Sequence, residues 1–178
     1  MGVGSYVPSY SSPNAQTGQS TNVTPFWMIG ATGAEVEVDT EAGQIKVLRL
    51  INVADAGTPI NPKIAKTQLS GAAIMQLGHT LYESMLFHNG QLTNGSLADY
   101  KIPGVRDIPV IENELVNADQ KNGPFGAKGV GESGTFGVSP AIGNAIHDAI
   151  GIRFTELPIT AEALLRAIRA RDGRPLKE

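Results

Sequence analysis

The sequence has 178 residues, in which 14 lysines and arginines stand against 17 aspartates and glutamates, and its formal net charge of −3 argues against a nucleic-acid binder with a basic surface. It contains no cysteine and therefore forms no disulfide, thiolate zinc site or iron–sulfur cluster of its own. No apolar run approaches the roughly 20 residues that span a bilayer, and the N-terminus lacks the features of a signal peptide. We therefore expect a cytoplasmic protein without a membrane span.

Charged side chains are absent from the first 34 residues, and small or polar residues dominate Gly2–Thr24. Such a segment cannot bury enough apolar surface to offset its ordering entropy alone. It is either a flexible tail or a segment packed against another subunit or domain. Disordered tails usually carry charge, and four aromatic side chains are available here for packing, namely Tyr6, Tyr10, Phe26 and Trp27. We therefore assign residues 1–30 to a segment packed on a partner and residues 31–178 to the folded domain.

Two adjacent strands are predicted next. From Ala34 to Asp39, apolar and acidic residues alternate, which is typical of a half-buried strand. The turn Thr40–Gly43 leads into Gln44–Ala54, where apolar residues are too dense for a strand with one wet face. We expect a hairpin whose second strand lies deeper in the sheet.

A long helix is predicted from Asn61 to about Leu86. Asn61 is a suitable N-cap, and the proline that follows it suits the first helical position, where no N–H is needed. One face of this helix carries Gln68 and two glycines, Gly71 and Gly78. Since glycine inside a helix costs about 1 kcal/mol relative to alanine, we expect another backbone or a ligand to approach this face closely.

The rest of the sequence predicts short elements joined by loops. A turn at His88–Gln91 separates two short strands, Tyr100–Pro109 is extended, and Val110–Val116 alternates like a strand. A second helix is predicted to start at Ser139-Pro140 and to run through Ile150, with Gly151 ending it. A short strand, Ile152–Leu157, follows. The last element is a helix that is capped by Thr160 and runs through Ala170. We expect an α+β fold with a mixed sheet, hairpin strands and packed helices.

Glycine is concentrated before and within the second helix, where residues 123–143 contain seven of the 21 glycines. Lys128 and Glu132 stand among them. Glycine neighbours let the backbone come close to a bound group and leave Glu132 projecting into a cavity. An enclosed carboxylate is costly to ionise, which suits a general base near neutral pH, and Lys128 could tune this carboxylate or contact an anion.

Three other interpretations of this segment compete with a catalytic one. The glycines at 129, 131 and 134 match the dinucleotide-binding string, but they do not follow a strand or lie in a βαβ unit with an acidic residue about 20 positions on. The phosphate-binding P-loop requires Gly-Lys followed by Ser or Thr, which the segment lacks. The third interpretation stays open, in which Glu132 only stabilises the start of the next helix. Elsewhere, the three histidines lack metal-ligand spacing, and we assign Glu83 a structural role.

Several motifs have the order and spacing of one known family. They are Asp55-Ala-Gly57 with Asn61-Pro62, Gln68-Leu-Ser-Gly71, Tyr100-Lys-Ile-Pro103 with Asp107-Ile-Pro109, Ala127-Lys-Gly-Val-Gly-Glu132, Ser139–Gly151 and Arg153–Pro158. From Gly30 to Ala170 the sequence resembles the end of the molybdenum-binding large subunit of molybdenum hydroxylases, the relatives of xanthine dehydrogenase, aldehyde oxidoreductase and aerobic carbon monoxide dehydrogenase. The resemblance implies that residues 31–178 form the C-terminal part of a larger molybdopterin-binding domain. Two departures are that many members carry glutamine in place of Met75, and that the family's upstream pocket loops are missing.

The resemblance also implies roles for individual residues. Glu132 matches the family's active-site glutamate, which accepts the proton of a water-derived oxygen as that oxygen attacks an electron-poor carbon. The implied cofactor-binding residues lie on the long helix and in the glycine-rich loop, and they are Gln68, Gly71, Lys128, Gly129, Val130 and Gly131. Family members hold molybdenum through the pterin dithiolene, so no direct protein ligand to the metal is expected.

The implied activity is that of a molybdenum-dependent hydroxylase or dehydrogenase acting on an N-heterocycle or aldehyde type of carbon, with water as the oxygen source. The implied cofactors are the molybdenum cofactor, as molybdopterin cytosine dinucleotide, and 2Fe–2S clusters and FAD on partner subunits. The implied partners are the remaining part of the molybdenum subunit, an iron–sulfur subunit and a flavoprotein subunit. The alternative is a non-catalytic assembly module that keeps the family fold. The charge-free N-terminal residues favour that alternative, and the intact loop around Glu132 weighs against it.

Overall fold

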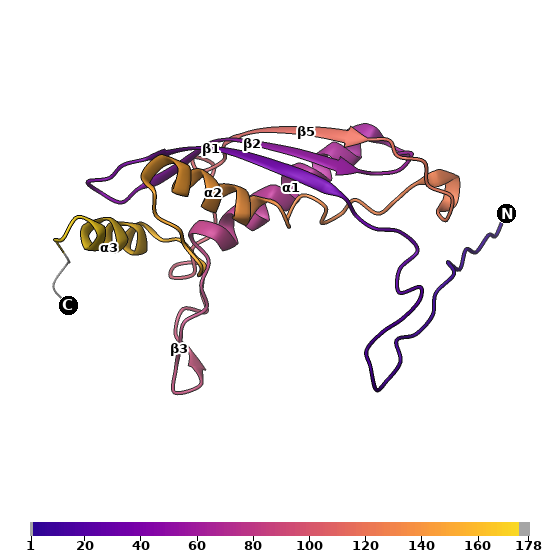
Figure 1. The fold of residues 1–178 in the computed structure, drawn as a ribbon, viewed down its shortest axis with the longest axis horizontal. Helices are drawn as coiled ribbons and strands as arrows, with labels where there is room; N and C mark the ends of the chain where they lie inside the picture. The colour runs from indigo at the N-terminus through magenta and orange to yellow at the C-terminus, as the bar shows by residue number, and fades with distance from the viewer. Residues whose placement is uncertain (1, 175–178) are drawn as a thin grey trace.

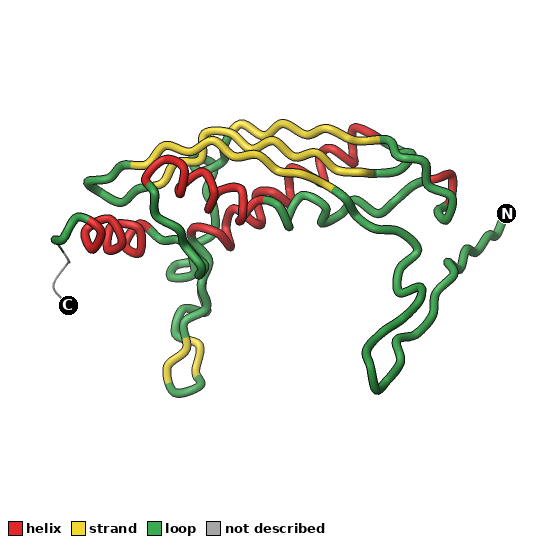
Figure 2. The backbone as a smooth tube through the Cα atoms, in the orientation of Figure 1, coloured by secondary structure: helices red, strands yellow, loops and turns green. Residues whose placement is uncertain are grey.

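The computed structural model describes residues 2–174 (Figures 1 and 2). In chain order the elements are β1 (Gly30–Val38), β2 (Ile45–Asp55), α1 (Pro62–Leu81), β3 (Phe87–His88), β4 (Gln91–Leu92), β5 (Val110–Val116), the single 3₁₀ turn η1 (Pro124–Gly126), α2 (Val138–Ile150) and α3 (Ala161–Arg171). Helices α1 and α2 lie beneath one face of the larger sheet, and α3 lies to one side (Figure 1). The predicted α+β class is confirmed.

The larger sheet is mixed and has the strand order β1-β2-β5. Strands β1 and β2 form the predicted antiparallel hairpin, whereas β5 runs parallel to β2. Parallel neighbours need a long crossover, which α1 and the segment after it supply. The central place of β2 explains its density of apolar residues, since Leu50 and Ala54 are almost completely buried. On β1 the alternation is as predicted, because Val36 is half-buried between the exposed Glu35 and Glu37.

Helix α1 begins as predicted and ends earlier. The Asn61 side chain caps it by accepting a hydrogen bond from the Ile64 N–H at 3.1 Å. The predicted end at Leu86 is wrong, because the helix stops at Leu81. The Gly78 carbonyl accepts the N–H groups of both residues 82 and 83, at 2.9 Å each, and this closes the last turn.

After α1 the chain forms an arm that leaves the body of the molecule and carries β3 and β4 (Figure 1). The predicted turn between these strands is confirmed, since Asn89 and Gly90 have φ angles of 49° and 80°. Both values are positive, as a two-residue type I′ turn requires. The buried side chain of Asn94 secures the base of this hairpin by accepting from the Leu86 N–H at 2.8 Å and donating to the Ser84 carbonyl at 2.6 Å.

The last two helices form where they were predicted, and α3 runs to Arg171, one residue beyond the predicted end at Ala170. Helix α2 begins at Val138, one residue before the predicted start, and Gly151 ends it with a φ of 73°. The Thr160 hydroxyl caps α3 by accepting from the Ala163 N–H at 3.1 Å.

The predicted strand Ile152–Leu157 is wrong, since this stretch lies outside every strand of the described residues. Its alternation is real, because Ile152 and Phe154 pack against the core while Arg153 and Thr155 are exposed. The alternating side chains pack onto the core without a neighbouring strand edge, so the backbone forms no ladder.

One hydrophobic core joins the sheet to the helices. Its buried members come from β2, α1, α2, α3 and the segment before α3, and they are Val47, Leu50, Ala73, Leu77, Leu81, Val138, Ile142, Ile146, Ile159, Leu164 and Ile168. The opposite face of the sheet is charged and exposed, and there Arg49 and Glu112 form an ion pair at 2.7 Å. The helices therefore cover one face only, in agreement with the alternation in β1.

Candidate functional site

The glycine-rich loop before α2 is fastened to the chain that follows β2. The Thr58 N–H donates to the Gly126 carbonyl at 2.7 Å, and the Lys128 N–H donates to the Ala56 carbonyl at 3.0 Å. Gly57 lies between these bonds with a φ of 58°, and a Cβ there would collide with the Gly126 carbonyl oxygen. Only glycine tolerates both the backbone conformation and this close approach. Two sequence motifs, Asp55-Ala-Gly57 and Ala127–Glu132, thus meet in the fold.

Beneath this junction Lys128 and Asp55 form a buried ion pair. The distance between Lys128 Nζ and Asp55 Oδ2 is 2.6 Å, and the two side chains are 9% and 8% exposed. Burial raises the pKa of Asp55, but hydrogen bonds from Lys128 and from the Gly57 N–H outweigh burial and hold this pKa below its ordinary value. The positive charge of the Lys128 ammonium is therefore already balanced by the Asp55 carboxylate of the same chain. A contact between this residue and a cofactor stays a prediction.

Glu132 lies in a turn of the same loop, and its side chain is exposed. The Ser133 N–H donates to the Val130 carbonyl at 3.2 Å, and the Thr135 N–H donates to the Glu132 carbonyl at 3.1 Å. The expected enclosure of this carboxylate is not provided by the part of the chain that the structure describes. Helix α2 begins only at Val138, beyond the reach of a first-turn charge effect, which weakens the interpretation of Glu132 as a helix-start residue.

Gly134 brings this loop onto α1. A Cβ at Gly134 would lie 2.6 Å from the Leu69 carbonyl oxygen and 3.2 Å from Ala72 Cβ. Gln68 and Gly71, which neighbour these two buried helix residues in sequence, are exposed, and a Cβ at Gly71 would meet nothing within 4 Å. The loop that carries Glu132 thus packs on α1 at the residues next in sequence to Gln68 and Gly71, and Gly71 itself faces open space.

The other helix glycine, Gly78, packs tightly against later residues of the same chain. A Cβ at Gly78 would collide with the Glu83 carboxylate and lie 2.9 Å from Pro103 Cδ. Glu83 in turn accepts a hydrogen bond of 2.7 Å from the Tyr100 hydroxyl, in agreement with its predicted structural role. A close approach was expected at both glycines. Other residues of the described chain come close to Gly78, but none comes close to Gly71.

Three consecutive residues before β1 also contact the loop, and the sequence did not single them out as site residues. A Cβ at Gly129 would lie 3.8 Å from Phe26 Cζ, and the Trp27 carbonyl accepts from Lys128 Nζ at 3.3 Å. The Ser133 hydroxyl donates to Met28 Sδ at 3.2 Å. Their only sequence signal was aromatic content in an uncharged segment. The end of segment 1–30 therefore packs on its own chain, and the packing of the residues before it on a partner stays a prediction.

The remaining predicted residues of the loop differ in their surroundings. Val130 is half-buried, whereas Gly131 is exposed and a Cβ there would meet nothing within 4 Å. Within residues 2–174, no group of three or more His, Asp or Glu side chains could hold a metal ion.

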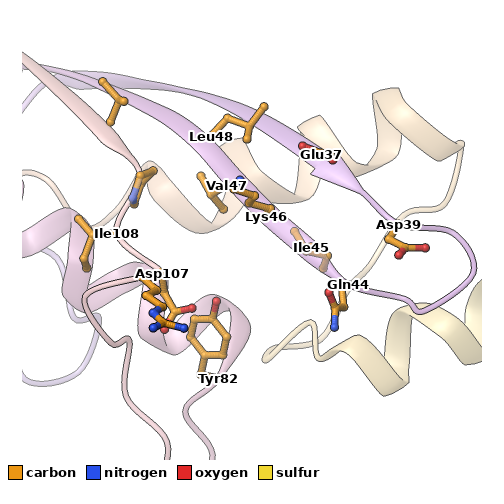
Figure 3. A pocket seen from close by; sticks show the side chains of 13 residues that line it. Glu37, Asp39, Gln44, Ile45, Lys46, Val47, Leu48, Tyr82, Asp107 and Ile108 are labelled. Atoms are coloured by element: carbon orange, nitrogen blue, oxygen red, sulfur yellow. The ribbon is translucent and has the colours of Figure 1, made fainter.

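A cleft of about 590 Å³ lies away from these residues, between the start of β2 and the segment that leads into β5 (Figure 3). Tyr82 and Asp107 lie next to each other in it, and burial together with the Asp107 carboxylate raises the pKa of Tyr82. None of the predicted site residues lines this cleft. The Glu132 loop and α1 stay the predicted site.

Comparison with known proteins identifies the family. The model of the molybdopterin cofactor-binding domain matches residues 2–109. The chain is 37% identical over 153 residues to a probable xanthine dehydrogenase subunit of Bacillus subtilis, and this match covers 86% of this chain and 20% of that protein. It is 40% identical over 134 residues to the aldehyde oxidoreductase molybdenum-binding subunit PaoC of Escherichia coli, covering 74% of this chain and 18% of that protein.

A solved structure agrees with these matches. The aldehyde oxidoreductase of Desulfovibrio gigas superposes with a TM-score of 0.81 at 31% identity, over 89% of this chain and 17% of that one. The chain thus spans a fifth or less of the length of these relatives. No helix among the described residues is long and apolar enough to cross a membrane. Family model, relatives and fold agree, and the chain belongs to the molybdopterin cofactor-binding domain of the molybdenum hydroxylase large subunits.

Proposed function

We propose that this chain is the Glu132-bearing part of the catalytic molybdenum subunit of a multi-subunit hydroxylase. The remaining part of that subunit, an iron–sulfur subunit with 2Fe–2S clusters and a flavoprotein subunit with FAD would complete the enzyme. The substrate is a small molecule with an electron-poor carbon, of the N-heterocycle or aldehyde type. The observation that carries the proposal is the exposed Glu132 in a loop that packs on α1 at Leu69 and Ala72, the residues next in sequence to Gln68 and Gly71.

The residues present fit a pterin cofactor. Gly71 and Gly131 are both exposed, and a Cβ at either would meet open space, so backbone is accessible on the helix and on the loop. The exposed Gln68 amide can donate and accept hydrogen bonds, which suits the polar edge of a pterin. Gln68, Gly71 and residues 128–131 would hold the group, in the form of molybdopterin cytosine dinucleotide. When bound, the molybdenum cofactor supplies the two-electron oxidation.

Glu132 would act as the general base. The overall reaction converts R–H and water into R–OH, two protons and two electrons, so a proton must leave the attacking oxygen as the C–O bond forms. A Glu132 carboxylate oxygen accepts that proton. The electrons leave through the clusters of the partner subunits. In the assembled enzyme the missing part of the subunit would exclude water from this carboxylate.

Molybdenum analysis of the natively purified complex tests the proposal. About one molybdenum per chain, together with larger subunits that carry iron, is the expected result. If the chain purifies without molybdenum and without partners, the proposal is wrong, and a non-catalytic module with the family fold is the better description.

Replacing Gln68 by alanine should reduce cofactor content without weakening the fold. The side chain is exposed, so the free energy of unfolding should change by less than about 0.5 kcal/mol. Molybdenum content per complex and the melting temperature of the chain are the two measurements. The matched control is Lys63→Ala, an exposed residue of the same helix, which should change neither. Unchanged molybdenum with a large fall in melting temperature would contradict the assignment of Gln68.

Replacing Gly71 by alanine should have opposite effects on folding and on cofactor binding. Because Gly71 is in a helix and faces open space, the substitution should stabilise the chain by up to about 1 kcal/mol. The added methyl group would occupy the space we assign to the cofactor, so molybdenum content should fall. Gly143→Ala on α2 is the matched control, since it also meets open space and should stabilise the chain with molybdenum content unchanged. Equal molybdenum content in both variants would remove Gly71 from the site.

A further inference from the structure

Backbone hydrogen bonds and packing hold the loop that carries Glu132 at several points, and a buried side-chain ion pair holds it at one more. Lys128 lies four positions before Glu132, and its ammonium contacts Asp55 Oδ2 at 2.6 Å in a pair that is more than nine-tenths buried. Glu132 itself is exposed, and it lies in a turn held by longer backbone hydrogen bonds of 3.1 and 3.2 Å. On its C-terminal side the Glu132 turn is held by the packing of Gly134 on α1, and on its N-terminal side the buried side chain of Lys128 fixes it.

Asp55 is also fixed from three other directions. Its N–H donates to the Ile29 carbonyl at 2.8 Å, its carboxylate accepts from the Gly57 N–H at 2.9 Å, and it ends strand β2 in the middle of the sheet. Lys128 additionally donates to the Trp27 carbonyl at 3.3 Å. The pair thus connects the sheet, the segment before β1 and the Glu132 loop at one point.

We infer that Asp55 is a positioning residue, which fixes the Glu132 loop against the sheet through the buried ammonium of Lys128. We call the ion pair of Asp55 and Lys128 the clamp, because it joins the Glu132 loop to the sheet. The consequence for catalysis rests on the proposed function, since it needs Glu132 to be the general base. The clamp itself does not rest on that function. In this role the Lys128 ammonium fixes the loop through its contact with Asp55.

The chemistry of the pair allows a test that separates positioning from general stability. Asp55→Asn or Lys128→Met leaves one buried charge without its partner, which is costly to the whole fold. The double variant Asp55→Asn/Lys128→Met removes both charges and keeps similar side-chain volumes. It should therefore regain much of the melting temperature lost in the single variants, but it lacks the ion pair that fixes the loop.

Hydrogen exchange by mass spectrometry on the full chain in its native complex is the first measurement. In the double variant we expect the backbone amides of residues 129–136 to exchange at least about tenfold faster, with α3 amides unchanged as the internal reference. Glu112→Gln, which breaks the exposed ion pair to Arg49, is the matched control and should leave residues 129–136 unchanged. The inference is overturned if loop exchange in the double variant equals that of wild type, or rises equally throughout the chain.

Steady-state kinetics on the same complex is the second measurement. A misplaced base should lower kcat by about 10–100-fold with KM within about threefold, because a displacement of about 1 Å can cost 100-fold in rate. Faster loop exchange with an unchanged kcat would overturn the positioning role of Asp55. If the wild-type complex holds no molybdenum, the proposed function fails, whereas the exchange measurement still decides whether the clamp exists.

Discussion

Replacing Glu132 by glutamine should lower the turnover number of the complex by about 10²–10⁴-fold, the usual contribution of a general base. Glutamine keeps the shape of the side chain but cannot take up the proton from the attacking oxygen. Because Glu132 is exposed in this chain and makes no contact on which the fold depends, the melting temperature should not change. The measurement is kcat per bound molybdenum.

The matched control for this prediction is Glu41→Gln. Glu41 is also exposed but lies in the turn between β1 and β2, where a catalytic role is not expected. Its kcat should equal that of wild type. If Glu132→Gln retains full molybdenum and a kcat within about tenfold of wild type, Glu132 is not the base, and the proton must leave by another route.

The second large effect is expected on stability. Lys128→Met should lower the free energy of unfolding by about 3–5 kcal/mol, because it leaves the Asp55 carboxylate buried without its counter-charge. The matched control is Arg49→Met, which breaks an ion pair whose side chains are 44% and 49% exposed and should cost no more than about 1 kcal/mol. Urea denaturation of the full chain measures both. If both variants lose the same free energy of unfolding, the buried pair contributes no more to stability than the exposed one.

The pH dependence of this difference supplies an internal check. In wild type the pKa of Asp55 is lowered, so its contribution to stability is present above the ordinary pKa of an aspartate and is lost as the pH falls through the folded-state value. In Lys128→Met the hydrogen bond and the charge of Lys128 no longer lower this pKa, so that burial, which has the largest influence on it, raises the pKa against the remaining hydrogen bond from the Gly57 N–H. A protonated Asp55 does not need a counter-charge. The stability difference between wild type and variant should therefore shrink as the pH falls toward about 4, the ordinary pKa of an aspartate, and a constant difference would contradict this account.

Local sequence signals predicted those features whose energies depend on neighbouring residues. The Asn61 cap of α1, the Thr160 cap of α3 and the turn at Asn89-Gly90 all formed where they were expected. The β1–β2 hairpin formed for the same reason, because alternation and turn residues are read within a few positions. The glycine-rich loop was likewise recognised as a candidate site, since so many glycines are unfavourable in a regular helix or strand.

Features that depend on distant residues were not predictable from local patterns. Leu86 fits the periodicity of α1, but the helix ends at Leu81 where the Gly78 carbonyl closes the turn and the arm begins. The segment 152–157 alternates like a strand, but packing on the core places no strand edge beside its backbone. The parallel pairing of β2 with β5 joins residues about 60 positions apart, which no local pattern specifies.

The site shows the same division. Residue patterns were enough to find Glu132 in a glycine-rich loop, to put Gln68 and Gly71 on one helix face, and to match both motifs to one family. The packing of distant segments was needed to show that Gly78 is a packing contact while Gly71 faces open space, and that Lys128 is paired with Asp55, 73 positions away. The physical reason is that residue type sets which contacts a side chain can make, whereas a buried charge takes the partner that the fold brings within hydrogen-bond distance.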